Sequence, residues 1–194
     1  PSPAAINLVL YPGVAFGTGV HPTTRLCREW LGRSVSPSCS VLDYGGGSGI
    51  LAIAAARLGA ARVAGVDIDP QAVESARANA ERNEVSALFA DSAEPVAGEY
   101  DLVVANILSN PLRVLAPAIC AHVRSGGCLA LSGILREQAE EIIAIYAQWL
   151  PMEVADTRCL LYTSDAADER SSVDLGGRRI IKKKKVLNHG EHAV

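Results

Sequence analysis

The sequence predicts an α/β fold in which helices cover both faces of a doubly wound parallel sheet. Three observations predict it. Short apolar segments alternate along the chain with longer segments of helical composition. The apolar segments are nearly continuous, which is typical of strands buried on both faces of a parallel sheet. A glycine-rich turn, GGGSG at residues 45–49, follows the first apolar segment and leads into an alanine-rich one.

Six segments have the apolar composition expected of strands. The fourth is the most continuously apolar, as expected for a central strand. In chain order, the predicted strands are residues 40–45, 62–69, 87–91, 100–107, 126–134 and 152–158.

Four segments between the predicted strands are expected to be helical. Gly59 is a glycine stop for the first helix, and Asp69 with Pro70 is an N-cap followed by a favoured first helical residue. The third is predicted to be helical despite Pro117. The predicted helices are residues 48–60, 70–83, 110–123 and 136–150.

The composition limits the class of protein. No apolar run approaches the roughly 20 residues of a membrane helix, and the N-terminus lacks the pattern of an export signal. The five cysteines and four histidines show no metal-ligand spacing, which predicts reduced thiols and no metal. We therefore expect a cytoplasmic monomer without a membrane partner. The chain opens without methionine, which is typical of a fragment.

The C-terminal residues differ in character from the rest. Residues 1–158 contain no lysine, whereas all four lysines are consecutive at 182–185. Residues 159–169 and 173–181 can be back-translated into the transposase adapter used in sequencing libraries, and a run of adenines would encode the lysines. We predict that residues 159–194 are a non-native, adapter-derived tail. The alternatives are a solvated basic tail and, least favoured, a nucleic-acid-binding patch.

The glycine-rich turn is placed where open α/β sheets bind ligands, between the carboxyl end of a strand and a helix. Its spacing is G-x-G-x-G at Gly45, Gly47 and Gly49, not the dinucleotide pattern G-x-G-x-x-G. Glycines allow a close approach of the backbone to a ligand. A tight turn without a ligand is the alternative.

Three polar residues end the next predicted strands at the same edge. Asp67 ends the second strand, at the spacing of a carboxylate that accepts ribose hydroxyls. Asp91, or Ser92 beside it, would lie near an adenine edge, and Asn106 would face the pocket. The alternatives are a helix cap for Asp67, loop chemistry for Asp91 and a turn-forming Asn106. Together with the glycines, these residues predict a nucleoside-binding edge.

This pattern resembles the class I S-adenosylmethionine-dependent methyltransferases. The blocks FGTGVHPTTRLCREWL, DYGGGSGILAIAA, GVDIDPQAV, VVANIL and LSGIL narrow the resemblance to the PrmA family, bacterial methyltransferases of large-subunit ribosomal protein eleven. The likeness covers nearly all of residues 8–158. It implies a Rossmann-like methyltransferase domain over residues 16–158 that lacks its native last strands. Residues 1–15 would be the linker end of an absent N-terminal substrate-docking domain.

The resemblance also implies site residues. Thr24, Gly45, Asp67 and Asn106 would contact S-adenosylmethionine, together with Gly47, Gly49 and Asp91 of the predicted edge. The family usually has cysteine where this chain has Gly46. The expected reaction is methylation of amino groups, on lysine side chains and the N-terminus, of the ribosomal protein. Asn106 with neighbouring backbone carbonyls would hold the neutral amine, and His21 is expected to be structural, a general base being the alternative.

The sequence leaves four alternative functions. One is lysine methylation of another protein, such as electron-transfer flavoprotein. A nucleic-acid N-methyltransferase would show N-P-P-[YF] after the fourth strand, whereas this chain has NILS at residues 106–109 and no aromatic residue to stack a flipped base. The glycine spacing disfavours a nicotinamide dehydrogenase. The last is a truncated cofactor-binding remnant without catalysis.

Overall fold

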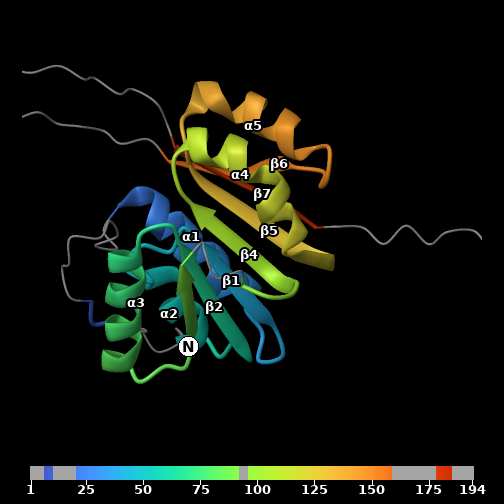
Figure 1. Cartoon of the computed structure of the whole chain (residues 1–194). Helices are drawn as coiled ribbons and strands as arrows, with labels where there is room; N and C mark the ends of the chain where they lie inside the picture. Colours follow the sequence, from blue (N-terminus) through green and yellow to red (C-terminus); the bar gives the residue numbers. More distant parts are fainter. Residues whose placement is uncertain (1–6, 11–20, 92–95, 159–177, 185–194) are drawn as a thin grey trace, which may run out of the picture.

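The computed structural model describes residues 7–10, 21–91, 96–158 and 178–184. Its strands form one seven-stranded sheet in the order β3-β2-β1-β4-β5-β7-β6 (Figure 1). The first five strands in that order are parallel to one another, whereas β7 runs antiparallel to both β5 and β6. The strands are β1 (Ser40–Tyr44), β2 (Arg62–Asp67), β3 (Leu88–Asp91), β4 (Tyr100–Asn106), β5 (Val123–Ile134), β6 (Glu153–Arg158) and β7 (Arg178–Lys184).

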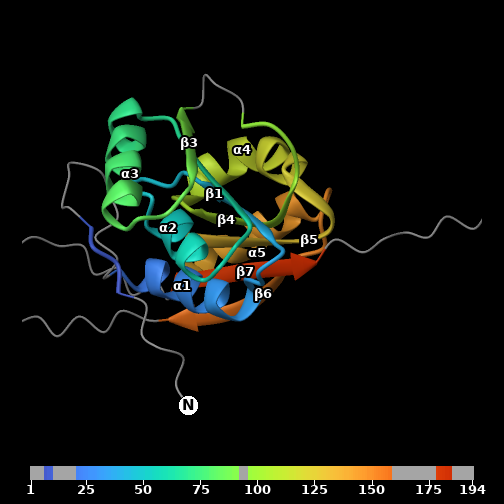
Figure 2. The same cartoon turned by 90° about the horizontal axis from the view of Figure 1, so that it is seen from below.

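Two groups of helices cover opposite faces of the sheet (Figures 1 and 2). One group packs its buried side chains with Val41 and Val104, and the other packs with Leu42 and Val103, because successive strand residues face opposite sides. The first group is α1 (Pro22–Ser34), α2 (Ile50–Arg57) and α3 (Pro70–Arg82), and the second is α4 (Ser109–Ala121) and α5 (Ala139–Tyr146). No helix in the described ranges is long and apolar enough to cross a membrane.

The doubly wound α/β prediction is confirmed. All six predicted strands are present, and the caps lie where the sequence places them: Asp69 accepts a hydrogen bond from the Gln71 backbone N–H at 2.9 Å. The last predicted helix begins as a short 3₁₀ turn over Arg136–Gln138. Helix α1 was not predicted, although Pro22 at its first position is a start signal.

Strand β7 is the main difference from the expected sheet. The sheet was expected to lack its last strands, whereas Arg178–Lys184 lies between β5 and β6. These residues belong to the segment predicted to be adapter-derived, from which no native strand is expected. Two adjacent β-branched isoleucines give the segment a composition compatible with a strand whatever its origin. The origin of residues 159–194 stays a prediction.

Candidate active site at the carboxyl ends of the strands

The predicted polar residues meet at one edge of the sheet. Asp67 is the last residue of β2 and stands in register with Asp91, the last residue of β3. Asn106 is the last residue of β4 and stands in register with Ser132 of β5. The glycine turn follows β1, which lies between β2 and β4. Because the five strands are parallel, their carboxyl ends form a common edge.

Backbone hydrogen bonds fix the glycine turn. The N–H groups of Gly45 and Gly46 both donate to the carbonyl oxygen of Val66, at 2.7 and 3.2 Å. Gly45 has a φ of +77°, and a Cβ atom there would lie closer than 3.0 Å to the side chain of Ile107. A residue with a side chain would therefore be both strained and obstructed at this position.

Asp67 connects the glycine turn to β2. One carboxylate oxygen accepts a hydrogen bond from the Gly47 N–H at 2.8 Å, and the other accepts one from the Asp69 N–H at 3.0 Å. A carboxylate oxygen can accept more than one hydrogen bond, so both retain capacity for a ligand hydroxyl. Asp69, not Asp67, caps α3, so the helix-cap alternative for Asp67 does not hold.

Asn106 is oriented by the helix that the sequence reasoning missed. Its Nδ2 donates a hydrogen bond to Oγ1 of Thr24, at 3.2 Å. Thr24 is on α1 and is buried. Because the amide nitrogen faces Thr24, the amide oxygen faces away from Thr24. It can then accept a hydrogen bond from another group.

Asp43 on β1 is a site residue that sequence reasoning overlooked. Its side chain is fully buried, and Oδ2 accepts a hydrogen bond from the Ala52 N–H at 3.1 Å. Within the described residues, Oδ1 has no hydrogen-bond partner. Burial raises the pKa of Asp43 to about 7, opposed by the Ala52 hydrogen bond and reinforced by the charge of Asp67. An acidic residue inside an otherwise apolar strand was the available signal.

The unpartnered, buried Oδ1 of Asp43 indicates which kind of cofactor the site would fit. An anionic oxygen in a low-dielectric site is stabilised by a nearby positive charge. S-adenosylmethionine carries a sulfonium and an ammonium group, and Asp67, the predicted ribose acceptor, lies at the same edge. The residues present therefore fit a cationic nucleoside.

Comparisons with known proteins identify the family. The model of the family described as "Ribosomal protein L11 methyltransferase (PrmA)" matches residues 1–158. This chain belongs to the PrmA family. A ribosomal protein L11 methyltransferase of Dechloromonas aromatica (strain RCB) is 82% identical over 158 residues, 81% of this chain and 53% of that protein. The corresponding protein of Thiobacillus denitrificans is 62% identical over 149 residues, 77% of this chain and 50% of the relative. The chain spans about half the length of the curated relatives it matches.

Solved structures agree with the PrmA assignment. The crystal structure of a ribosomal protein L11 methylase from Lactobacillus delbrueckii subsp. bulgaricus superposes with a TM-score of 0.70 and 32% identity, covering 91% of this chain and 84% of the other. A tRNA m1G37 methyltransferase of M. jannaschii gives a TM-score of 0.68 at 17% identity, covering 90% of this chain and 52% of that one. The second similarity shows only the shared Rossmann-like methyltransferase fold.

In this PrmA chain, His21 contacts Thr23 in the first turn of α1. It is the N-cap of α1, its Nδ1 accepts from the Thr23 N–H at 3.4 Å, and it lies 2.7 Å from Thr23 Oγ1. The contact supports the structural interpretation of His21. The preceding FGTGV residues of the motif, 16–20, lie outside the described residues.

Two other buried groups lie beside the candidate site. Ser132 is fully buried, and its hydroxyl donates to the Thr23 carbonyl at 3.5 Å. Burial raises the pKa of the Cys27 thiol to about 12, opposed by a hydrogen bond with Ser132. Cys27 is therefore a neutral packing residue at physiological pH and not a nucleophile. No group of three or more His, Cys, Asp or Glu side chains in the described segments could hold a metal ion.

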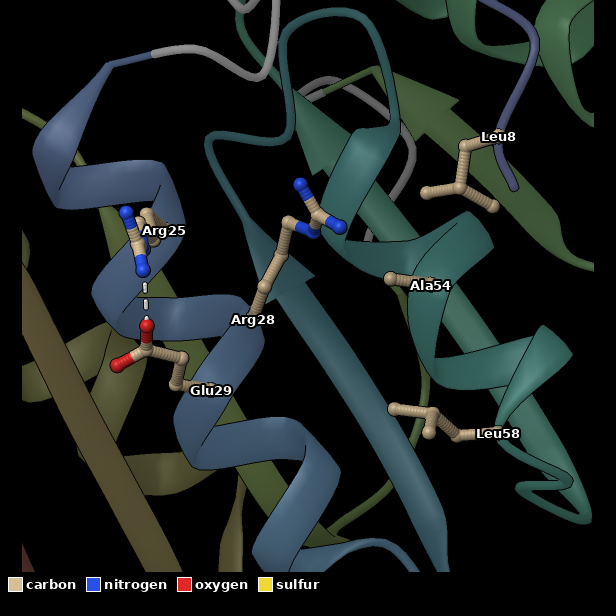
Figure 3. A pocket seen from close by; sticks show the side chains of 6 residues that line it. All are labelled: Leu8, Arg25, Arg28, Glu29, Ala54 and Leu58. Carbon is tan, nitrogen blue, oxygen red and sulfur yellow. Dashed lines mark hydrogen bonds and ion pairs between the residues drawn. The ribbon is translucent and has the colours of Figure 1, made fainter. Parts of the chain in front are cut away.

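A different set of residues lines a cavity of about 440 Å³ (Figure 3). Its lining comes from α1, α2 and the N-terminal segment, and it contains no predicted site residue. Arg25 in its wall is paired with Glu29 at 2.9 Å. The residues that line the cavity are Leu8, Arg25, Arg28, Glu29, Ala54 and Leu58.

Proposed function

We propose that this chain carries the catalytic domain of an S-adenosylmethionine-dependent protein N-methyltransferase that methylates amino groups of ribosomal protein L11. The observation that carries the proposal is the shared sheet edge, where the glycine turn, Asp67 and Asn106 lie together. The 82% identity to a ribosomal protein L11 methyltransferase supports the substrate. Such an enzyme would act in the cytoplasm, where ribosomal proteins are made, and as a monomer.

The cofactor half of the site would be formed by β1, β2 and β3. The Asp67 carboxylate would accept the ribose hydroxyls, and the backbone at Gly45, Gly47 and Gly49 would approach the amino-acid part. Thr24 and Asp91 would complete the contacts. When bound, the cofactor supplies a sulfonium methyl group for transfer to a neutral amine nitrogen.

The amine half of the site would be formed at the end of β4. A lysine amine has a pKa of about 10.4 and must lose a proton before it can attack. The amide oxygen of Asn106 and neighbouring backbone carbonyls would accept the N–H groups of the neutral amine and orient its lone pair. The same oxygens would stabilise the positive charge that develops on nitrogen. The one proton released is the one that the lysine ammonium loses to water before the attack, and the product is a methylammonium ion.

Calorimetric titration of S-adenosylmethionine into this chain tests the cofactor, with Asp67→Ala alongside. Asp69→Ala is a matched control, because it removes a nearby carboxylate that caps α3 but does not bond to the glycine turn. We expect saturable binding by the wild type and Asp69→Ala, and its loss in Asp67→Ala. A folded wild-type chain that does not bind would contradict the proposal.

Mass spectrometry of purified L11 after incubation with this chain and cofactor tests the substrate. We expect added methyl groups on lysine side chains or the N-terminal amine. Binding of the cofactor without methylation would favour the cofactor-binding remnant. Methylation of electron-transfer flavoprotein but not L11 would favour the other lysine methyltransferase.

We also propose that the native domain covers residues 16–158, that residues 1–15 are the end of a linker from a substrate-docking domain and that residues 159–194 are adapter-derived. The end of the family match at residue 158 supports the last boundary. Resequencing the gene from unamplified genomic DNA tests it. We expect the codons after Arg158 to differ from those that encode CLLYTSDAADE, and the same codons in genomic DNA would contradict an adapter origin.

A further inference from the structure

Asn83, at the C-terminal end of α3, binds the backbone of the N-terminal segment, residues 7–10. Its Oδ1 accepts a hydrogen bond from the Val9 N–H at 2.9 Å, and its Nδ2 donates to the Val9 carbonyl at 2.7 Å. One side-chain amide thus binds both backbone groups of one residue. Val9 is 60% exposed, so the segment is held at this point through its backbone and not through a buried side chain.

Asn79, one turn earlier on α3, binds the glycine turn. Its Nδ2 donates a hydrogen bond to the Ser48 carbonyl at 3.0 Å. The backbone carbonyl of Asn79 accepts a hydrogen bond from Nδ2 of Asn83, at 2.7 Å. Residues four apart lie on the same face of a helix. The two asparagines therefore form one continuous series of hydrogen bonds between the N-terminal segment and the glycine turn.

This series of hydrogen bonds is buried. Asn79 is fully buried, and Asn83 and Ser48 are 2% and 4% exposed. An amide that loses its partner in such a place is left unsatisfied, which costs more than the hydrogen bond itself contributes. The turn also packs closely on the same helix, because a Cβ atom at Gly49 would lie 2.8 Å from Cβ of Ala76. Helix α3 thus holds the glycine turn by a hydrogen bond and by steric contact.

We propose that Asn79 and Asn83 are positioning residues, through which the N-terminal segment at Val9 strengthens cofactor binding by the glycine turn. The inference rests on the proposed function and adds a remote determinant to it. The bound segment fixes the Asn83 amide, and that amide fixes the last turn of α3. Asn79 then holds the Ser48 carbonyl in the glycine turn. A turn that is already ordered loses less conformational freedom when a ligand binds, which raises the affinity.

Val9→Pro breaks the first hydrogen bond without a change in the site. Proline has no N–H, so Oδ1 of Asn83 loses its donor. Val9→Ala is the matched control, because it removes the exposed side chain and keeps both backbone groups. Calorimetric titration of S-adenosylmethionine into each full chain measures the affinity. We expect Val9→Pro to weaken binding about threefold, within the range of one hydrogen bond, and Val9→Ala to bind like the wild type.

Asn79→Ala breaks the series at its other end. We expect binding to weaken about tenfold, because the Ser48 carbonyl loses its donor in the turn itself. Glu81→Ala is the control, since Glu81 is exposed on the same helix. In the double variant, Val9→Pro should have no further effect, because the connection to the turn is already broken. Two unconnected structural defects would instead multiply their effects.

Hydrogen exchange followed by mass spectrometry separates positioning from a general loss of stability. It needs neither the cofactor nor Asn79→Ala, so it decides the matter if that variant does not fold. Peptides over residues 45–50 report on the turn, whose N–H groups bond to Val66 and Asp67. Peptides over residues 126–134 report on β5. We expect Val9→Pro to speed exchange in the turn about threefold and to leave β5 unchanged.

Three results would overturn the inference and leave the proposed function intact. They are equal affinities of Val9→Pro and the wild type, effects that multiply in the double variant, and equally faster exchange in the turn and in β5. A folded wild type that does not bind S-adenosylmethionine would overturn the proposed function itself, and the inference with it.

Discussion

The two halves of the site are held by different kinds of interaction. On the cofactor side, hydrogen bonds to the neighbouring strand β2 fix the glycine turn: Val66 accepts from two turn N–H groups and Asp67 accepts from a third. On the amine side, Asn106 is held by one hydrogen bond to α1, and Ile107 by steric contact with Gly45 and Gly133. The first half is held by hydrogen bonds between two adjacent strands, and the second half depends on packing between more distant segments.

Asn106→Ala breaks the amine side. We expect turnover at saturating cofactor to fall about 10²–10³-fold, because an oriented acceptor for the developing charge is lost. Initial rates of L11 methylation measure it. Asn110→Ala is the control, since Asn110 is exposed at the start of α4 and pairs with Arg113. Full turnover in Asn106→Ala would show that the amide has no such role.

Gly45→Ala breaks the cofactor side. A Cβ atom in the turn requires Ile107 to move and places alanine at a φ of +77°. We expect the affinity for S-adenosylmethionine to fall about 100-fold, close to 3 kcal/mol, as measured by calorimetry. Gly59→Ala is the control, because Gly59 has a φ of +95° and open space around it. Equal affinities in the two variants would mean that the turn tolerates a side chain.

Asp43→Asn sharpens the comparison by removing a buried charge from the cofactor side. Because the pKa of Asp43 is raised to about 7 when folded, the wild type is most stable when this group is protonated. Its stability should fall as pH rises from about 4 toward and through 7. We expect more than about 1 kcal/mol of this loss to disappear in Asp43→Asn.

Urea unfolding between pH 5 and 8.5 measures the effect. Asp101→Asn is the control, since burial of Asp101 is outweighed by hydrogen bonds from Ser40 and Arg124, which lower its pKa. That carboxylate stays ionised over the whole range. Parallel pH profiles of wild type and Asp43→Asn would contradict the assignment.

His21→Ala tests whether His21 only caps α1 or also acts as a general base. The loss of the α1 N-cap should lower the free energy of unfolding by about 1 kcal/mol. We expect turnover from pH 6 to 9 to remain unchanged, because His21 contacts Thr23 in its own helix cap. A pH-dependent loss of turnover would instead support a role as a general base.

The parts that sequence predicted are those governed by neighbouring residues. Strand composition, the Asp69 cap and the glycine turn each depend on a few adjacent positions. Helix α1 was missed because its residues were read as a binding motif and not for their cap, His21–Pro22. Asp43 was missed because its burial follows from helices packed on both faces. The contact of Gly133 with Ile107 depends on the register of β4 and β5, which no local pattern reveals.

At the opposite edge of the sheet, one side chain links the amino-terminal ends of adjacent strands. The Asp101 carboxylate, at the start of β4, accepts from the backbone N–H and the hydroxyl of Ser40 on β1, at 2.7 and 2.6 Å. It also pairs with Arg124 near the start of β5. One side chain thus cross-links the amino-terminal ends of three adjacent strands. This cross-link lies at the end of the strands opposite Asn106, so it ties the three strands together without occupying the candidate site.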